Sequence, residues 1–267
     1  MPTILVTGAI DGLGRAVATS LAESGARVVL HGRDDARGED AIAEIAEATG
    51  NEDIHWQRAD FASLDSVAAL AESVQRDHDR LDVLVNNAGI GTSGPREESE
   101  DGHELRFAVN YLAHFALTRA LLPLLAASAP ARIVNVSSAG QAPIDFDDVM
   151  LENRYDGVQA YCQSKLAQVM FTIDLAEELD SGAVTANCLH PASYMPTKMV
   201  RKAGVSPMSS LEQGRDATVR LVNDAQLAGV SGRYFNGIDE SRAHPQAYDR
   251  EARRRLRELS ERLIKIL

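Results

Sequence analysis

Short apolar runs alternate with longer amphipathic stretches along most of the chain. Runs rich in Val, Ile and Leu predict β-strands at residues 3–8, 27–32, 53–60, 81–89, 131–138, 184–191 and 232–237. Stretches with helical spacing separate most of them, most clearly at residues 15–25, 38–50, 64–77 and 107–128. Such alternation predicts a parallel sheet of about seven strands with helices on both faces. Right-handed crossovers then make this a doubly wound α/β fold.

Two segments, residues 141–157 and 192–209, follow neither pattern. Each comes after the carboxyl end of a predicted strand, where open α/β sheets bind their ligands. We therefore expect both segments to form substrate loops. No Pro-, Gly- or Ser-rich linker and no internal repeat divides the sequence, so residues 1–267 are predicted to form a single domain.

Composition narrows the class of protein. Net charge is −12, which opposes binding to nucleic acid or to an anionic membrane. The basic run at residues 250–263 carries Glu and Leu at helical spacing and is interpreted as a solvent-exposed helix face. With only Cys162 and Cys188, neither a disulfide framework nor a metal site is expected. The N-terminus lacks a basic leader, and we expect no stretch to be apolar over the length needed to span a bilayer. We expect a cytoplasmic protein without a membrane anchor.

A glycine-rich motif, "TGAIDGLGR", lies between the first strand and the first helix. Gly8, Gly12 and Gly14 allow a sharp turn and a close approach of the backbone to a ligand. The start of the helix offers N–H groups and a positive dipole end to a phosphate. The spacing differs from the usual Gly-x-Gly-x-x-Gly fingerprint, but its place after a buried strand predicts a Rossmann-type dinucleotide site.

Two residues after the second strand bear on the choice of cofactor. An acid there would bind the ribose 2′-hydroxyl of NAD, whereas an Arg would bind the 2′-phosphate of NADP. Arg33 comes first and Asp34 follows. We favour NADP through Arg33, with Arg15 adding positive charge, and keep NAD through Asp34 as the alternative.

Further polar residues follow the third, fourth and fifth strands. They are Asp60, the "NNAG" stretch at residues 86–89, and Ser138. Tyr161 and Lys165 lie four residues apart and so share one face of a helix. Parallel strands bring all these residues to the same edge of the sheet, although each residue type also occurs in ordinary turns and caps.

Taken together, "TGAIDGLG", "NNAG", the Asn110 of "FAVNYLAHF", the Ser138 of "VNVSS" and "YCQSK" resemble the motifs of the short-chain dehydrogenase/reductase family. The resemblance covers nearly the whole chain and is closest to the retinol-dehydrogenase-like branch. It implies that Tyr161 exchanges the proton of a carbonyl or alcohol and that Ser138 orients the substrate oxygen. Lys165 would hold the nicotinamide ribose, and Asn110 would hold a water that relays protons. An ammonium near Tyr161 is expected to lower the pKa of the phenol.

The resemblance also implies a set of cofactor contacts: Thr7, Gly8, Asp11, Gly12, Leu13, Gly14, Arg33, Asp60, Phe61, Asn87, Ala88, Gly89, Tyr161, Lys165, Pro191, Ser193 and Thr197. The chain departs from the family pattern in three places. Asp11 puts an acid in the glycine loop, where it could cap the following helix. Ala192 replaces a glycine, and Thr197 comes one residue late.

The two irregular segments bring apolar and amide side chains that we expect to line a substrate pocket: Gln141, Ile144, Phe146, Tyr155, Tyr194, Met195 and Met199. Such a lining suits a lipophilic carbonyl or alcohol, although the same residues could pack the loops onto the core. The resemblance further implies a homo-oligomer paired through the helices that contain residues 113–125 and Tyr161. Other readings are an NAD-dependent alcohol dehydrogenase, an epimerase or dehydratase, and a non-catalytic sensor of the cofactor.

Overall fold

A computed structural model describes residues 1–264 of the chain and confirms a single α/β domain. Every predicted strand forms, and a short antiparallel strand is added after the turn at Gly237 (φ 61°). The strands are β1 Thr3–Val6, β2 Arg27–Gly32, β3 Ile54–Arg58, β4 Val83–Asn86, β5 Ala131–Val136, β6 Val184–His190, β7 Tyr234–Asn236 and β8 Asp239–Ser241.

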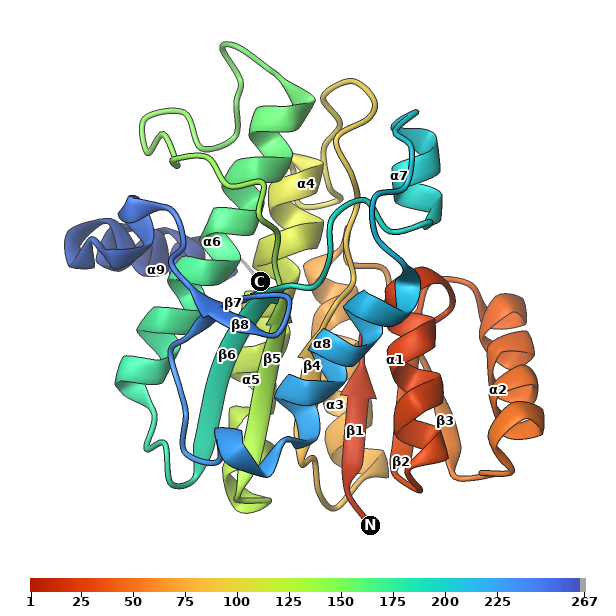
Figure 1. Ribbon diagram of the computed structural model, residues 1–267. Helices are drawn as coiled ribbons and strands as arrows, with labels where there is room; N and C mark the ends of the chain where they lie inside the picture. Colours follow the sequence, from red (N-terminus) through yellow and green to blue (C-terminus); the bar gives the residue numbers. More distant parts are fainter. Residues whose placement is uncertain (265–267) are drawn as a thin grey trace.

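The sheet has the order β3-β2-β1-β4-β5-β6-β7-β8, and its first seven members are parallel (Figure 1). The chain reverses its direction of winding between β1 and β4, which is the switch point where such sheets bind ligands. The α-helices are α1 Gly12–Glu23, α2 Asp35–Thr49, α3 Leu64–Asp77, α4 Leu105–Phe107, α5 Ala113–Ala127, α6 Gly157–Glu178, α7 Lys198–Lys202, α8 Leu211–Asn223 and α9 Arg250–Ile264. A π-helical turn, η1 Ala108–Leu112, joins α4 to α5, and two 3₁₀ turns are η2 Ala225–Leu227 and η3 Pro245–Tyr248.

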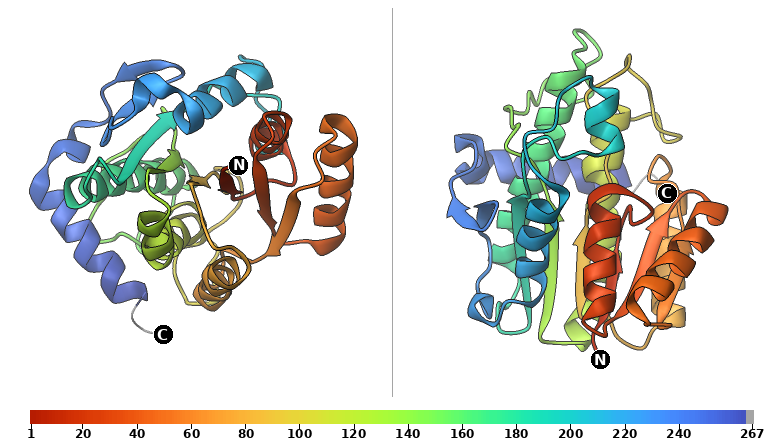
Figure 2. Two further views of the ribbon diagram at one scale, coloured as in Figure 1. Left: turned by 90° about the horizontal axis from the view of Figure 1, so that it is seen from below. Right: turned by 45° about the vertical axis from the view of Figure 1, so that its right-hand side comes forward.

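Different sets of helices cover the two faces of the sheet (Figure 2), and each face buries its own apolar core. Helices α1, α2 and α8 cover one face, with Leu21 and Leu221 among the buried side chains. Helices α3, α5 and α6 cover the other face, and α9 packs on the outside of α6 through Leu256. Because the middle of the sheet is covered on both sides, its central strands β1 and β4 are buried in every position and largely apolar.

One sequence expectation about membranes was wrong. The continuous helical stretch Leu105–Ala127 is long and apolar enough to span a bilayer by length and composition. However, 67% of its most apolar window is buried inside the molecule. Packing against the sheet and against α3 and α6 therefore accounts for the apolar composition of this stretch.

Candidate functional site

The glycine loop lies at the switch point, between the ends of β1 and β4. Gly8 has a left-handed backbone (φ 66°), and a Cβ there would lie 2.8 Å from the Cα of Ala88. A Cβ on Gly14 would lie 2.3 Å from the carbonyl oxygen of Gly8. Only glycine permits this close backbone, which leaves the first turn of α1 open to a ligand phosphate. The loop thus fits a dinucleotide.

Thr7 holds the glycine loop against the stretch after β4. Its hydroxyl oxygen accepts hydrogen bonds from the backbone N–H groups of Asn87 (2.8 Å) and Ala88 (2.9 Å). The side-chain amide of Asn87 donates back to the carbonyl of Thr7 at 2.8 Å. Sequence-distant parts of the predicted cofactor site are therefore brought together as expected.

Asp11 does not cap α1, in contrast to one sequence interpretation. Its carboxylate instead accepts from the guanidinium of Arg37 (2.6 Å) and pairs with the ammonium of Lys198 (2.9 Å). Burial raises the pKa of Asp11, but the two cations more than offset this, and the net pKa lies below the ordinary value. These partners explain how an acid is tolerated in a phosphate-binding loop.

The groups after β2 have distinct roles. The Asp34 carboxylate caps α2 by accepting from the backbone N–H of Arg37 (3.2 Å). The side chain of Arg33 is 70% exposed and lies 3.7 Å from Asp60. The guanidinium of Arg15, which we expected to add positive charge at this place, pairs with Glu44 at 2.6 Å.

Beyond β3, Asp60 forms a local turn by accepting from the N–H of Ala62 (3.0 Å). The ring of Phe61 is buried, stacked on His31 with ring centroids 4.4 Å apart and edge-on to His114. Its side chain therefore belongs to the core, and only its backbone remains for a ligand. Ser63, rather than Asp60, caps α3.

Ser138, Tyr161 and Lys165 meet at the carboxyl end of β5. Helix α6 starts at a cap, where Asp156 accepts from the N–H of Gln159 (2.8 Å), and this places Tyr161 in its second turn. A Cβ on Gly140 would lie 3.5 Å from the Ser138 hydroxyl and 3.8 Å from the Tyr161 ring. The Lys165 ammonium lies 5.8 Å from the centroid of that ring. The phenol of Tyr161 thus has both the Ser138 hydroxyl and the Lys165 ammonium as neighbours.

The electrostatics of Tyr161 differ from the expectation. Burial raises the pKa of the phenol, and the hydrogen bond with Ser138 offsets only part of this, so the net pKa lies above the ordinary value of 10.0. The predicted lowering by Lys165 was wrong for the protein alone. Burial instead lowers the pKa of Lys165 itself to about 7, which weakens its effect on the neighbouring phenol.

Asn110 sits in the π-helical turn between α4 and α5. Its side-chain oxygen accepts from the N–H of Ile90 (2.8 Å), and its amide donates to the carbonyl of Ile90 (3.1 Å) and to Ser164 (3.0 Å). Asn110 therefore ties the loop after β4 to α6, close to Lys165. A π-turn in this position is a frequent feature of functional sites.

Sequence reasoning missed two buried polar residues beside this group. The Lys165 ammonium donates to the side-chain oxygen of Gln168 (2.8 Å), and the Gln168 amide lies 3.3 Å from the imidazole of His114. Burial lowers the pKa of His114 to about 3, so it is neutral at physiological pH. The spacing of three residues between Lys165 and Gln168 was a usable signal, because such residues share a helix face.

Three residues that we predicted to line the substrate pocket instead pack against other parts of the fold. Ile144 is buried in the core. The ring of Phe146 lies under the guanidinium of Arg255 on α9, 4.5 Å from its centroid. Met195 packs against α8, where a Cβ on Gly214 would meet its sulfur. An apolar residue in an irregular segment can serve a core as well as a pocket, which is why sequence could not separate them.

The other predicted pocket residues take different positions. Tyr155 bonds to the fully buried pair Glu104 and Arg106, and Gln141 donates to the carbonyl of Ser138 (2.8 Å). Tyr194 is 49% exposed, has a left-handed backbone (φ 46°) and is near enough to influence the pKa of Tyr161. Met199 lies across Gly91, after β4.

The segment after β6 approaches the glycine loop. Ser193 bonds to the imidazole of His190 (3.0 Å), directly beside Pro191. Thr197 caps α7 through the N–H of Val200 (3.4 Å). A Cβ on Gly12 would lie 3.3 Å from the Thr197 methyl group, so Thr197 borders the predicted cofactor site.

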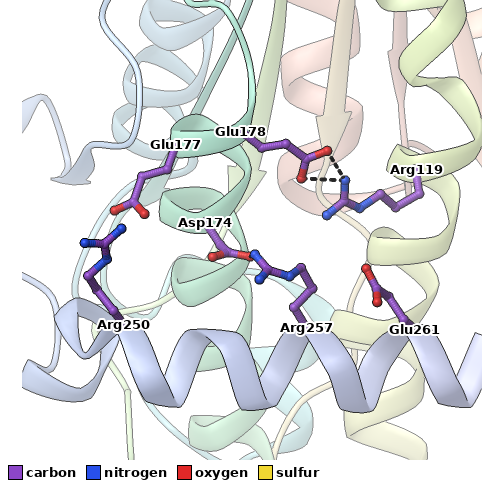
Figure 3. A pocket seen from close by; sticks show the side chains of 7 residues that line it. All are labelled: Arg119, Asp174, Glu177, Glu178, Arg250, Arg257 and Glu261. Carbon is purple, nitrogen blue, oxygen red and sulfur yellow. Dashed lines mark hydrogen bonds and ion pairs between the residues drawn. The ribbon is translucent and has the colours of Figure 1, made fainter.

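A cavity of about 510 Å³ lies elsewhere, among α5, α6 and α9 (Figure 3). It is lined by Arg119, Asp174, Glu177, Glu178, Arg250, Arg257 and Glu261. These charges hold α9 in place, since Arg257 pairs with Asp174 (2.7 Å) and the buried Arg253 pairs with Glu177 (2.5 Å). The interpretation of the basic run as a solvent-exposed helix face holds for Arg250, Arg254 and Arg255 but not for the buried Arg253. Because α9 occupies this side of α6, oligomerisation through α6 stays a prediction.

Comparison with known proteins gives consistent results. Residues 2–206 match the family model described as short chain dehydrogenase. Retinol dehydrogenase 13 of Homo sapiens is 39% identical over 98% of the chain and 84% of its own length. A structure of an uncharacterized protein from Mycobacterium paratuberculosis aligns with a TM-score of 0.80 and 31% identity, covering 99% of this chain and 94% of that one. A Shigella flexneri short chain dehydrogenase complexed with NADP gives a TM-score of 0.70 and 29% identity, covering 88% and 96%.

Proposed function

The chain belongs to the short-chain dehydrogenase/reductase family, in its retinol-dehydrogenase-like branch, and on this premise we propose that it is an NADP-preferring oxidoreductase of lipophilic carbonyls and alcohols. Membership makes it an NAD(P)-dependent enzyme acting on CH–OH or C=O groups. The preference for NADP, the lipophilic substrate and the residue roles are the proposed parts.

The observation that carries the proposal is the convergence of Ser138, Tyr161 and Lys165 at the carboxyl end of β5, where Lys165 borders the loop after β4. When bound, the nicotinamide ring supplies or accepts the hydride. A substrate oxygen held by the Ser138 hydroxyl would lie within reach of the Tyr161 phenol. In reduction, Tyr161 gives its proton to that oxygen, and in oxidation it takes the proton back.

The protonation states suit reduction near neutral pH. Because burial raises the pKa of Tyr161, the phenol stays protonated and can act as the acid. Lys165 keeps its ammonium form up to a pH of about 7 and would donate to the ribose hydroxyls. We therefore expect reductive turnover to fall as the pH rises through the pKa of Lys165.

The preference for NADP is supported by the groups after β2. Asp34 uses its carboxylate as the cap of α2, which competes with a role as acceptor for a ribose 2′-hydroxyl. Arg33 is exposed on the same side, with Asp60 as a distant partner at 3.7 Å. The guanidinium of Arg58 donates to the carbonyl of Arg33 (3.3 Å) and adds positive charge for a 2′-phosphate.

A lipophilic substrate is supported by exposed apolar side chains on the segment after β6. Tyr194, Met199, Val205 and Met208 remain 37% to 73% exposed there, and Tyr194 is close to Tyr161. Apolar side chains exposed beside a reactive group favour ligands that cover them. Because relatives are named retinol dehydrogenases, retinal and a medium-chain aldehyde such as nonanal are suitable first probes.

The test measures NADPH and NADH consumption side by side, with retinal, nonanal and smaller aldehydes and ketones, for the wild type and Tyr161→Phe. We expect Tyr161-dependent turnover that favours NADPH and increases with the apolar size of the carbonyl. A preference for NADH would transfer the cofactor role to Asp34. Equal turnover of small and large carbonyls would contradict the lipophilic site, and turnover that survives in Tyr161→Phe would contradict the role of the phenol.

A further inference from the structure

The Lys165 ammonium is held from two sides by neutral oxygens. It donates to the backbone carbonyl of Val136 at 3.0 Å and to the side-chain oxygen of Gln168 at 2.8 Å. An ammonium has three N–H groups, so these two bonds leave one for the site. The position of a Cβ on Gly89, 3.7 Å from the Lys165 nitrogen, shows that the loop after β4 borders it.

Lys165 is buried without an ion-pair partner among the described residues, so these two acceptors stabilise its charge. Lys165 is 4% exposed and Gln168 1% exposed, and no ion pair to Lys165 occurs within residues 1–264. The titratable groups facing it are Tyr161, on the same helix, and His114, from α5. His114 is neutral and Tyr161 is protonated near neutral pH, so neither balances the charge.

The amide nitrogen of Gln168 lies beside His114, whose Nδ1 donates to the carbonyl of Asn110 and so cannot also accept from the amide. The bond to Lys165 therefore sets the orientation of the amide. The imidazole Nδ1 lies 3.3 Å from the Gln168 nitrogen and 3.0 Å from the carbonyl of Asn110, and Nε2 lies 3.3 Å from the Thr7 hydroxyl. With its nitrogen on the His114 side, the amide turns its oxygen toward the ammonium. A buried chain of contacts therefore runs from the glycine loop to Lys165.

From this chain we propose that Gln168 is a positioning residue, whose side-chain oxygen aims the Lys165 ammonium at the cofactor ribose and keeps it protonated during turnover. The inference rests on the role proposed above for Lys165. Gln168 would act through Lys165 and would not itself contact substrate or cofactor, in addition to the predicted catalytic residues Asn110, Ser138, Tyr161 and Lys165.

The test compares the pH dependence of kcat/KM for NADPH-dependent reduction of nonanal or retinal, whichever is turned over, in three variants. Gln168→Met keeps the volume but removes the oxygen, so Lys165 should lose its proton more readily. In a plot of kcat/KM against pH, activity should fall at high pH as Lys165 loses its proton, and we call this fall the descending limb. In Gln168→Met the descending limb should move to lower pH by about one unit, the size expected for a lost hydrogen bond to a charged group. Gln168→Glu places a carboxylate there and should move the limb to higher pH.

The matched control is Gln163→Met. Gln163 is another fully buried amide of α6, but it donates to the carbonyl of Val149 (2.7 Å) and makes no hydrogen bond to Lys165 among the described residues. This variant should lose comparable stability and keep the wild-type limb. If Gln168→Met fails to fold, the position of the descending limb in Gln168→Glu is the measurement that tests the proposal.

Opposite shifts in the two Gln168 variants would establish the proposal, whereas a wild-type limb in both would overturn it. Lys165→Met separates this from the proposed function. If Lys165→Met abolishes turnover and the Gln168 variants keep the wild-type limb, only the positioning role is wrong. If Lys165→Met retains turnover, the role of Lys165 fails and the inference fails with it.

Discussion

The two halves of helix α6 differ in the partners of their charged side chains. Near its start, Lys165 is buried against neutral partners, the carbonyl of Val136 and the amide of Gln168. Near its end, carboxylates face arginines of the neighbouring helices, as Asp174 does with Arg257 and Glu178 with Arg119 (Figure 3). Within residues 1–264, the first half carries a cation with no ion-pair partner, and the second half carries carboxylates paired with arginines.

This contrast separates a site of chemistry from a site of assembly. An ion pair such as Asp174–Arg257 holds α9 on α6 at little cost, because each charge keeps its counter-ion. An unpaired ammonium in a buried place is costly, as its lowered pKa of about 7 records. Such a group beside a phenol and a hydroxyl supports the catalytic role that we propose for this half of α6.

The largest effect is expected from Tyr161→Phe, which removes the proton donor and leaves the ring. Turnover should fall about 10³-fold, the typical contribution of a general acid. NADPH affinity should change little, because the phenol adds one hydrogen bond at most. The measurement is kcat for aldehyde reduction together with a fluorescence titration of NADPH. Loss of cofactor binding would instead indicate a structural role for Tyr161.

At the other end of α6, Arg253→Met should affect stability and spare chemistry. Arg253 is buried and donates to Glu177 (2.5 Å), so its removal should lower the free energy of unfolding by about 2 kcal/mol. Turnover of the folded variant should stay within about twofold of wild type. Urea unfolding and kcat/KM check both parts. A large loss of turnover without loss of stability would break the distinction between the two halves.

His114 gives a pH dependence of stability whose sign is fixed. Its pKa is about 3 in the folded protein and near 6.5 when unfolded. Below pH 6.5 the His114 imidazole binds a proton in the unfolded chain but stays neutral in the folded protein. Between pH 6.5 and 3 this residue should therefore remove about 1.4 kcal/mol of stability per pH unit.

The matched variant is His114→Gln, which cannot titrate. Urea unfolding at several pH values below 6.5 should give the variant a shallower loss of stability than the wild type. Burial likewise lowers the pKa of His31 to about 4, and this contribution is common to both proteins. Identical pH slopes would show that His114 accepts a proton in the folded state.

The smallest effect concerns the cofactor. Arg33→Ala should raise the KM for NADPH about tenfold, which corresponds to one charge-assisted hydrogen bond. The KM for NADH should stay unchanged, since NADH lacks the 2′-phosphate. Arg15→Ala is the control, because its partner is Glu44. An equal rise for both cofactors would argue against a 2′-phosphate contact.

The sequence predicted the sheet and the place of the reacting group because both depend on local patterns. Apolar runs specify strands, and parallel strands carry the residues after them to one edge. Ser138, Tyr161 and Lys165 meet for that reason. The counterparts of Asp11 could not be predicted, since Arg37 and Lys198 lie far along the chain and meet it only in the fold.

Burial of polar side chains was the least predictable feature. In the sequence, Arg253 cannot be distinguished from the exposed charges of an amphipathic helix. Its burial results from the packing of α9 on α6, where it pairs with Glu177. Ile144 and Met195 resemble pocket residues because irregular segments carry no period that separates core from surface. The raised pKa of Tyr161 follows from desolvation, which depends on the whole packed structure.

The most direct test of the contrast within α6 is the titration of Lys165 itself. The side-chain nitrogen signals of ¹⁵N-lysine-labelled protein would be followed across pH by NMR, with Lys165→Met providing the assignment. We predict one lysine that loses its proton near pH 7, far below the ordinary value of 10.5. A Lys165 that titrates at its ordinary value would show a solvated or counter-charged ammonium and would contradict the account.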